Sequence, residues 1–525
     1  MGWNSAVAFG CGIDEKSMRQ QVDLMESSGL RDSGYVTFIL GCGWQAIDRA
    51  KDGTFAANQQ AFPSGMNGMA KYVHGKKMQF GLTSTAGDHP CGTRAKAHSK
   101  MIGSRNHEVA DVKTFVGWGI DFLKMEFCWA DNPHTPVDYN PNFSVKDRFK
   151  VTRDALIASG APVTYAISAW GIQNPLSWPV KDYANLWRIG DDVAGASDTW
   201  SRVVRTINQF ASEAWANEPG TFADLDLLEV GQGGLTRIEV ITQFTFWAAA
   251  NSSRHRKHRS PLIISTDLTR LDPSLIGHFK NPKLIAVNQD PLGASIRLRR
   301  RYTDQHDVWS GPLKDGSVVV VIVNFLADTL LIDFNLADLG LLSANIVDLW
   351  TEDALDVWNT TIPLQTSTHG VQLLKLTEMV PKPPVKYQKY PAIGPNCDLY
   401  GMAAKRVTGT GLAVAGNVGK GAYVQWHDVD GGDQGGRKYV TIDYIMADSE
   451  LVIKSDCPRC REAYITVNGG PDVKLNFPAS GNSWDDVYRD YLLEMDGFTP
   501  GPTNKIKISN GNALTPDLVN IGVQI

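Results

Sequence analysis

The sequence contains no apolar run long enough to cross a membrane. Its longest such stretch, Val318 to Ala327, has the length of a buried strand. There is no basic excess either: the formal net charge of the 525 residues is −5, which argues against nucleic acid as the main partner. Repeats and low-complexity tracts are also absent. A composition of 43% hydrophobic and 20% charged residues is typical of a globular protein, and the length predicts two to four domains.

Cysteine is scarce. Seven residues are too few for a disulfide scaffold, but they permit a few bridges. Three triplets beginning at Asn142, Asn251 and Asn359 are glycosylation acceptors if the protein is secreted. No signal peptide is present, and Met1–Ser5 already reads as part of a first strand, which predicts a mature or trimmed form. We therefore expect a secreted, extracellular glycoprotein.

The first part of the chain, residues 1–292, alternates short apolar strands with helical segments. The expected strands are Gly2–Phe9, Tyr35–Leu40, Gln79–Ser84, Phe122–Phe127, Val163–Ala169, Leu186–Ile189, Leu225–Val230 and Leu262–Ser265. Eight such units of this size predict an α/β fold, the (β/α)8 TIM barrel. A doubly wound open sheet is the alternative. It usually carries a glycine-rich phosphate loop after the first strand, and Cys11–Asp14 is not one.

Helical periodicity is lost after the barrel. Residues 293–378 contain short β-rich runs separated by Gly, Asp and Asn, which predicts an antiparallel β-sandwich. Residues 379–394 include the proline-rich stretch Val380–Val385 and are expected to form a stiff linker. Residues 395–525 are again β-rich and predict a second C-terminal β-sandwich.

A basic residue and an acid arrive together at the end of the stretch Ile120–Cys128. Lys124 and Glu126 lie two residues apart, so they share one face of the predicted strand. The carboxyl end of a parallel strand is where a barrel enzyme places its chemistry. The alternative is that Glu126 only caps a loop and pairs with Lys124.

A second group of charged residues lies in Trp187–Val193. Asp191 or Asp192 would supply the second carboxylate of a glycosidase, in which one acid attacks the anomeric carbon and the other protonates the leaving oxygen. Arg188 would keep one carboxylate ionised or hold a sugar hydroxyl. Taken alone, this stretch could equally be a polar strand end with an Asx turn.

Both stretches belong to an ordered series of motifs. The series comprises Met1–Ser5, Phe62–Met66, Lys124–Glu126, Trp187–Arg188, Asp226–Gly231 and Ala286–Gly293. Together they resemble glycoside hydrolase family 27, the α-galactosidase and α-N-acetylgalactosaminidase family, over about Met1 to Glu378. The last segment resembles carbohydrate-binding modules of family 35 more loosely, through Ala422–Trp426 and Ala463–Gly469.

This resemblance implies a retaining double displacement. Glu126 would be the nucleophile and Asp192 the acid/base, with Asp191 in that role if the loop register differs by one. Sugar contacts are expected from Lys124, Arg188, Trp3, Trp44, Trp170 and Asp191. The family's disulfide across the site maps onto Cys91 and Cys128, and a second bridge would join Cys11 to Cys42.

The chain also departs from the family pattern. The nucleophile is Glu rather than Asp, and Gly41-Cys42 replaces the Asp pair that holds the galactose 4- and 6-hydroxyls. Thr83 replaces a Tyr, and Ala169 replaces a Glu or Asn. Hydrogen bonds to a hydroxyl give large discrimination, so we expect altered sugar recognition. The basic run Ser253–Arg259 also interrupts a segment that the family keeps compact.

Two functions follow from these residues. The first is an exo-acting retaining hydrolase of α-galactoside-like sugars, or a related activity such as a β-L-arabinopyranosidase or an isomaltodextranase. The second is a catalytically impaired barrel that only binds carbohydrate. In either case the expected partners are a carbohydrate substrate and a polysaccharide held by the terminal module, with neither nucleic acid nor a membrane.

No cofactor is expected. The histidines, such as His74, His89 and His98, lack metal-ligand spacing. Cys457–Cys460 has the spacing of a redox or zinc half-motif but has no second pair, which favours a local disulfide. The turn cluster Gly431–Gly436 could hold a structural calcium ion in the C-terminal module.

Overall fold

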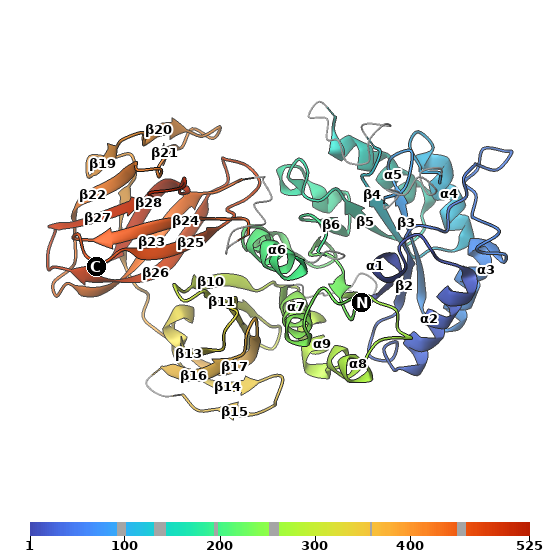
Figure 1. The fold of residues 1–525 in the computed structure, drawn as a ribbon, viewed down its shortest axis with the longest axis horizontal. Helices are drawn as coiled ribbons and strands as arrows, with labels where there is room; N and C mark the ends of the chain where they lie inside the picture. The colour runs from blue at the N-terminus through green and yellow to red at the C-terminus, as the bar shows by residue number, and fades with distance from the viewer. Residues whose placement is uncertain (92–100, 131–142, 194–197, 251–261, 358–359, 449–457) are drawn as a thin grey trace. The chain divides into compact units, whose positions relative to one another are not determined.

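The computed structural model describes residues 1–91, 101–130, 143–193, 198–250, 262–357, 360–448 and 458–525 (Figure 1). Three sets of sequence predictions lie outside these residues: the glycosylation acceptors at Asn142, Asn251 and Asn359, the basic run Ser253–Arg259, and Cys457. The contacts divide the chain into two compact units. One comprises Met1–Trp200 with Ala216–Ala294, and the other comprises Ser201–Trp215 with Ser295–Ile525.

The first unit is built on a parallel sheet with the strand order β7-β6-β5-β4-β3-β2-β1-β9-β8. Its strands are β1 (Gly2–Asn4), β2 (Thr37–Leu40), β3 (Gln79–Thr85), β4 (Phe122–Glu126), β5 (Thr164–Ser168), β6 (Leu186–Arg188), β7 (Phe222–Asp224), β8 (Leu228–Glu229) and β9 (Ile263–Ser265). The strands β7 and β8 are consecutive pieces of one barrel strand, the seventh; each barrel strand is here called a stave. The first piece pairs with β6 and the second with β9, so this split stave joins the two ends of the sheet. The predicted TIM-like fold is confirmed.

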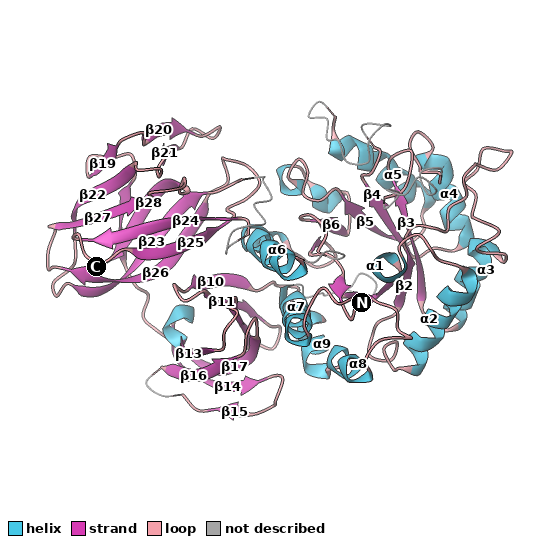
Figure 2. Cartoon of the chain, in the orientation of Figure 1, coloured by secondary structure: helices cyan, strands magenta, loops and turns pink. Residues whose placement is uncertain are grey.

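Helices alternate with these strands along the sequence (Figure 2), and all of them except most of α6 belong to the first unit. They are α1 (Ala6–Phe9), α2 (Glu15–Ser27), α3 (Gly65–Gly75), α4 (Glu108–Trp118), α5 (Val145–Ser159), α6 (Thr199–Glu213), α7 (Arg237–Ala250), α8 (Pro273–Phe279) and α9 (Pro282–Asn288). Inside the sheet, apolar side chains from β2, β4, β5, β6 and β7 form one packed cluster. Its members are Ile39, Phe122, Ala166, Leu186 and Phe222. Such a layer fills a barrel and leaves its carboxyl end for chemistry. None of the described helices has the length and apolarity needed to span a membrane.

The first predicted strand is wrong in its extent. It ends at Asn4, and Ala6–Phe9 forms the short helix α1. Side chains divert the backbone from the sheet at this point: the Asn4 amide oxygen accepts a hydrogen bond from the Ala6 N–H at 2.8 Å. The Ser265 hydroxyl accepts another from the Val7 N–H at 3.0 Å. Asn side chains that bond nearby backbone groups compete with the strand ladder in this way.

The second unit begins with antiparallel sheets. Its strands are β10 (Arg297–Arg301), β11 (His306–Pro312), β12 (Val318–Asn324), β13 (Leu330–Asn335), β14 (Leu341–Asp348), β15 (Ala354–Leu355), β16 (Thr361–Thr366) and β17 (Val371–Pro381). The pair β13-β16 and the six-stranded sheet β10-β11-β12-β17-β14-β15 enclose one apolar core. The alternation of buried and exposed residues along β14 and β16 is typical of strands with one solvent-facing side.

The terminal β-sandwich follows. It contains β18 (Tyr387–Pro391), β19 (Cys397–Tyr400), β20 (Ala404–Val407), β21 (Ala413–Gly416), β22 (Tyr423–Val429), β23 (Gly436–Ile445), β24 (Cys460–Val467), β25 (Val473–Pro478), β26 (Tyr488–Phe498), β27 (Asn504–Ser509) and β28 (Asp517–Gln524). One sheet has the order β20-β21-β28-β23-β26, with β18 also pairing with β28, and the other has the order β19-β22-β27-β24-β25.

The predicted linker 379–394 differs from the structure. β17 continues to Pro381, and β18 adds a strand to the terminal sheet, so within this segment 382–386 separate two strands. The prolines are tolerated because Pro381 is the last residue of β17 and Pro391 the last of β18, where a missing N–H interrupts no central ladder.

Candidate active site

The end of β4 carries the first pair of functional side chains. Leu123 and Met125 are buried, and the alternating residues Lys124 and Glu126 point to the opposite face. The Lys124 Nζ lies 3.8 Å from the Glu126 Oε1, and the two side chains are 12% and 20% exposed. Burial raises the pKa of Glu126, and the charge of Lys124 opposes this shift.

The end of β6 carries the second pair. Arg188 is buried, and its Nη2 lies 3.0 Å from the Asp192 Oδ1. The Asp192 side chain is 64% exposed, so its carboxylate is open to a ligand. Although the side chain is accessible, the protein groups around it partly desolvate Asp192 and work to raise its pKa, but the charges of Arg188 and Lys124 outweigh this effect and lower that pKa below its usual range.

Asp226 is a site residue that we did not predict from the sequence. It lies in the break between β7 and β8 and is 5% exposed, and its Oδ2 lies 2.5 Å from the Arg188 Nη2. The same oxygen accepts a hydrogen bond from the Val193 N–H at 2.7 Å. Asp226 therefore fixes the guanidinium and also the start of the loop after Asp192. A buried arginine needs a carboxylate partner, so Arg188 was itself the sequence signal that indicated a further acid such as Asp226.

The backbone of Asp226 has φ +84°, a conformation that favours glycine. Its carbonyl accepts a hydrogen bond from the Trp247 Nε1 at 2.9 Å, and its N–H donates to the Asp224 Oδ1 at 2.9 Å. Backbone strain of this kind is retained where surrounding contacts enforce it, often at functional sites. The break in the seventh stave thus turns a carboxylate toward Arg188.

The two predicted carboxylates come together electrostatically. Besides burial and Lys124, the charge of Asp192 raises the pKa of Glu126, and that of Asp226 acts in the same direction. Of the two aspartates considered for the acid/base role, Asp192 contacts Arg188. Three carboxylates and two cations from β4, β6 and the split stave therefore form one charged group.

The three predicted tryptophans occupy different positions. The Trp170 side chain, which follows β5 with φ +51°, donates a hydrogen bond to Asp192 and so belongs to the site. Trp3 is buried, stacks on Phe38 with 4.9 Å between ring centroids and donates to the Thr266 carbonyl. Trp44 is buried against aromatic residues that include Phe115 of α4. Neither Trp3 nor Trp44 has an accessible ring face, because core packing covers both.

Both disulfides implied by the family resemblance are present, joining Cys91 to Cys128 and Cys11 to Cys42. Cys42 therefore lies in a disulfide where the family pattern has an acid, and Gly41 beside it has no side chain. Cys460 is also disulfide-bonded, and Cys457, its predicted partner, lies outside the described residues.

Two hydroxyl groups lie beside the charged group; Ser168 was not predicted from the sequence, and Thr83 was identified there only as the replacement of a Tyr. Ser168 is in register with Glu126, and Thr83 is in register with Lys124. Both residues are buried, and their hydroxyl oxygens have no hydrogen-bond partner among the described residues. Residues in register on parallel strands share a face, so these hydroxyls accompany the two charged side chains.

Glu229, at the end of β8, is a further buried carboxyl group near Asp226. Its Oε2 has no hydrogen-bond partner within the described part of the chain. Burial, together with the charge of Asp226, raises the pKa of Glu229 to about 7. The folded state thus holds a proton that an unfolded glutamate releases near pH 4.5.

This shift predicts a pH-dependent gain from Glu229→Gln. The stability that the raised pKa provides is fully present below pH 4.5 and is lost as the pH rises through about 7. Glutamine keeps the shape of the protonated acid, so we expect the variant to raise the free energy of unfolding at pH 8 by roughly 3 kcal/mol. At pH 4.5 we expect little change. Urea unfolding at both pH values measures this, with the exposed Glu218→Gln as control. An equal gain at both pH values would contradict the assignment.

Among the described residues, no group of three or more His, Cys, Asp or Glu side chains is placed to hold a metal ion. The same holds for the described residues around Gly431–Gly436, where the sequence allowed a structural calcium ion. The candidate site contains carboxylates, cations, hydroxyls and one indole, and such groups can perform acid–base and nucleophilic chemistry.

Two family models match parts of this chain. Residues 7–290 match the family described as "Alpha galactosidase A", and residues 303–376 match the "Alpha galactosidase C-terminal beta sandwich domain". The alpha-galactosidase of Cyamopsis tetragonoloba is 33% identical over 380 residues, which cover 72% of this chain and 85% of that protein. The probable alpha-galactosidase D of Neosartorya fischeri is 33% identical over 389 residues, which make up 58% of its length. This chain thus spans little more than half of that relative.

Among solved structures, alpha-galactosidase I from Mortierella vinacea superposes with a TM-score of 0.64 at 27% identity. The match covers 73% of this chain and 98% of that one. The β-L-arabinopyranosidase from Geobacillus stearothermophilus, at 21% identity and a TM-score of 0.61, shares the fold. Both family matches end before the terminal sandwich begins.

Proposed function

The chain belongs to the alpha-galactosidase family, glycoside hydrolase family 27, and from this premise we propose that it is a retaining, exo-acting glycoside hydrolase. Its substrate would be a terminal α-galactoside-like sugar on an oligo- or polysaccharide. One observation carries the proposal: Glu126 and Asp192 come from different barrel strands, act on each other electrostatically, and each lies beside a cation.

In the first step Glu126 attacks the anomeric carbon as a carboxylate. The bond to the leaving oxygen breaks, and Asp192 donates its proton to that oxygen. A glycosyl ester on Glu126 results. In the second step Asp192 takes a proton from water, the resulting hydroxide attacks the anomeric carbon, and the ester bond to Glu126 breaks. Two inversions leave the anomeric configuration unchanged.

The cations set the charge states that these steps need. Lys124 opposes the effect of burial on Glu126 and so favours the ionised nucleophile. Arg188 favours ionised Asp192, whereas the first step needs it protonated. A sugar hydroxyl that accepts a hydrogen bond from Arg188 would weaken the interaction between Arg188 and Asp192. Substrate binding would therefore raise the pKa of Asp192. Asp226 would keep Arg188 in place throughout.

Recognition of the sugar would differ from that of a typical family member. At the end of β2, Gly41 and the disulfide-bonded Cys42 offer no carboxylate to the 4- and 6-hydroxyls. The hydroxyls of Ser168 and Thr83 lie beside the charged group but are buried, so they would not replace these contacts directly. A pyranoside without a C6 hydroxymethyl group, such as a β-L-arabinopyranoside, would leave fewer of its groups unpaired in this site.

A panel of p-nitrophenyl glycosides tests the proposal. It should include α-D-galactoside, β-L-arabinopyranoside, α-N-acetylgalactosaminide and α-D-glucoside, with NMR identification of the first sugar anomer released. We expect turnover of the galactoside or the arabinopyranoside with retained configuration. An inverted product would contradict the double displacement. Binding on a glycan array without turnover of any glycoside would support the impaired, carbohydrate-binding barrel.

We further propose that the terminal sandwich holds the enzyme on polysaccharide and that the protein works outside the cell. Disulfides persist in oxidising compartments, and the described residues include two complete ones. Reduction of the disulfide between Cys91 and Cys128 would remove a covalent constraint on the segment directly after Glu126.

A further inference from the structure

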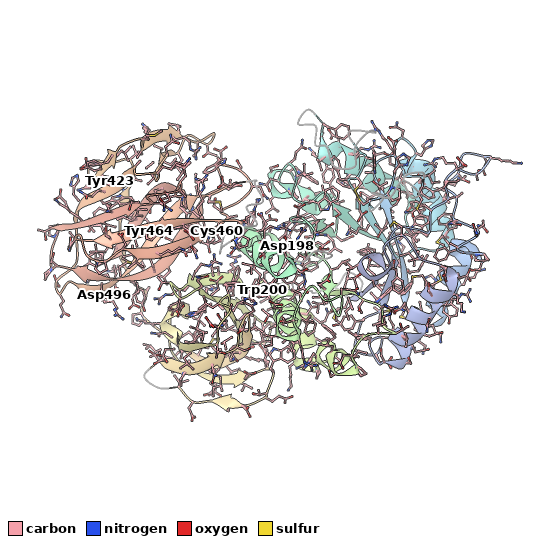
Figure 3. All side chains as sticks on the ribbon, in the orientation of Figure 1. Asp198, Trp200, Tyr423, Cys460, Tyr464 and Asp496 are labelled. Atoms are coloured by element: carbon pink, nitrogen blue, oxygen red, sulfur yellow. A yellow bond between two sulfur atoms is a disulfide. The ribbon has the colours of Figure 1, made fainter. Side chains whose placement is uncertain are left out.

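One sheet of the terminal sandwich presents a row of tyrosines on its outer face. Along the strands β19, β22, β27 and β24, the register aligns Tyr400, Tyr423, Ser509 and Tyr464 in this order. Residues aligned in this way point to the same side of a sheet. Figure 3 labels Tyr423 and Tyr464 on this sandwich. The row thus places tyrosines on both sides of a small serine.

The neighbouring positions show which side this is. Val424, Ile508 and Ile465 each lie one residue along their strand from the row, and all three belong to the buried core of the sandwich. Side chains alternate along a strand, so the tyrosines face away from that core. Tyr400 is 36% exposed, and Tyr423 and Tyr464 are half-buried. This outer face, consisting of Tyr400, Tyr423, Tyr464, Gln425, Lys507 and Ser509, is here named the tyrosine face.

Contacts within the tyrosine face fix the orientation of one ring. Tyr400 and Tyr423 stack with 4.4 Å between centroids and 14° between planes. On Tyr423, the Lys507 ammonium also lies 5.8 Å from the ring centroid. Within the described residues no carboxylate pairs with Lys507. Tyr423 and Tyr464 are two strands apart, about 10 Å, with the short Ser509 side chain between them.

These groups suit one class of ligand. Aromatic rings offer apolar faces to the C–H side of a pyranose ring, while hydroxyl, amide and ammonium groups bond its hydroxyls. The absence of aliphatic side chains from the tyrosine face disfavours an apolar peptide partner, because protein interfaces need an apolar centre. Its one central cation is too little for nucleic acid, which needs a basic patch.

We propose that the tyrosine face is a binding site for a neutral glycan chain, with one sugar ring seated between Tyr423 and Tyr464 over Ser509 and hydrogen-bonded by Lys507 and Gln425. This inference deepens the proposed role of the terminal sandwich. It commits to neutral sugars because the charges flanking the row balance: Asp398 lies next to Gln425 in the register, and Lys474 beside Tyr464 pairs with Glu462 at 2.7 Å.

Affinity electrophoresis of the full chain in gels containing galactomannan tests the site. Excess free galactose in every gel would occupy the barrel. We expect Tyr423→Ala and Tyr464→Ala each to weaken retention about tenfold, the effect of losing roughly 1.4 kcal/mol of stacking. Tyr439→Ala, on strand β23 of the other sheet, is the matched control and should bind like the unmodified chain.

Several results would overturn the site. They are unchanged retention in both tyrosine variants, an equal loss in Tyr439→Ala, or retention only in polygalacturonate gels that disappears with salt. Lys507→Met is a second variant that keeps every aromatic ring, and it should also weaken binding. Hydrolysis of a p-nitrophenyl glycoside should be the same in all variants. If that hydrolysis is absent from every protein while the tyrosine variants still lose retention, the barrel proposal fails and the binding site stands.

Discussion

Replacing Glu126 by glutamine is expected to lower kcat by about 10⁴-fold or more, the usual cost of removing a nucleophile. Glutamine preserves the size of the side chain but cannot form the glycosyl ester. It also leaves Lys124, 3.8 Å from the carboxylate in the structure, without its negative partner. Steady-state hydrolysis of the best p-nitrophenyl glycoside of the panel measures the effect. Substrate binding should persist, because Arg188 and Asp192 are intact.

Chemical rescue separates a nucleophile from a residue that only shapes the site. In Glu126→Ala, added azide should attack the anomeric carbon in place of the carboxylate and give a glycosyl azide of inverted configuration. Glu213→Gln is the matched control, since Glu213 is also a buried glutamate and its pKa is also raised, by burial, to about 7. Its kcat should be unchanged. Full activity in Glu126→Gln, or the absence of azide product, would remove Glu126 from the nucleophile role.

Shortening the same side chain tests the unusual length of the proposed nucleophile. Glu126→Asp restores the residue type of the family but withdraws the carboxylate by one methylene. Because the β4 register with β3 and β5 fixes the backbone at this position, we expect a loss of roughly a hundredfold. A faster variant would mean that the site still has the geometry of an aspartate enzyme.

Replacing Asp192 by asparagine is expected to slow hydrolysis in proportion to how much the leaving group needs a proton. For a natural oligosaccharide, loss of the proposed general acid should lower kcat/KM by about 10²–10⁴-fold. For a 2,4-dinitrophenyl glycoside, whose leaving group departs without protonation, the first step should be nearly unaffected. Parallel assays with both substrates therefore identify the acid by the ratio of the two decreases in kcat/KM, and not by the decrease for one substrate alone.

Asp191→Asn provides the comparison for this ratio. If Asp191 only contacts the sugar, its loss should slow both substrates by the same factor. A leaving-group dependence in Asp191→Asn rather than in Asp192→Asn would show that the loop register differs by one residue. It would also contradict the role inferred from the contact between Arg188 and Asp192.

Strand periodicity and the position of charges at strand ends were enough to predict the barrel, with Lys124, Glu126 and Arg188 at its carboxyl end, whereas the choice of Asp192 over Asp191 came from the family resemblance. These features depend on local sequence, since a side chain's face follows from its place in the strand. The role of Asp226 could not be predicted in this way. It depends on a break within one stave and on a backbone conformation that an aspartate rarely adopts.

The aromatic residues show the same limit. Trp3, Trp44 and Trp170 all lie in or near family motifs, but only Trp170 contacts a site carboxylate. Whether a tryptophan packs in the core or faces a ligand depends on neighbours that are distant in sequence, such as Thr266 for Trp3. The short helix after Asn4 was missed for a related reason, because the hydroxyl that diverts its backbone belongs to Ser265.

The break in the seventh stave has a consequence for how the protein loses its function. The strand pieces β7 and β8, which join the two ends of the sheet, also flank Asp226, the residue that holds Arg188. Closure of the barrel and the position of Arg188 therefore depend on the same short segment. We therefore expect mild heating or low urea to abolish the proposed hydrolysis before most of the barrel unfolds.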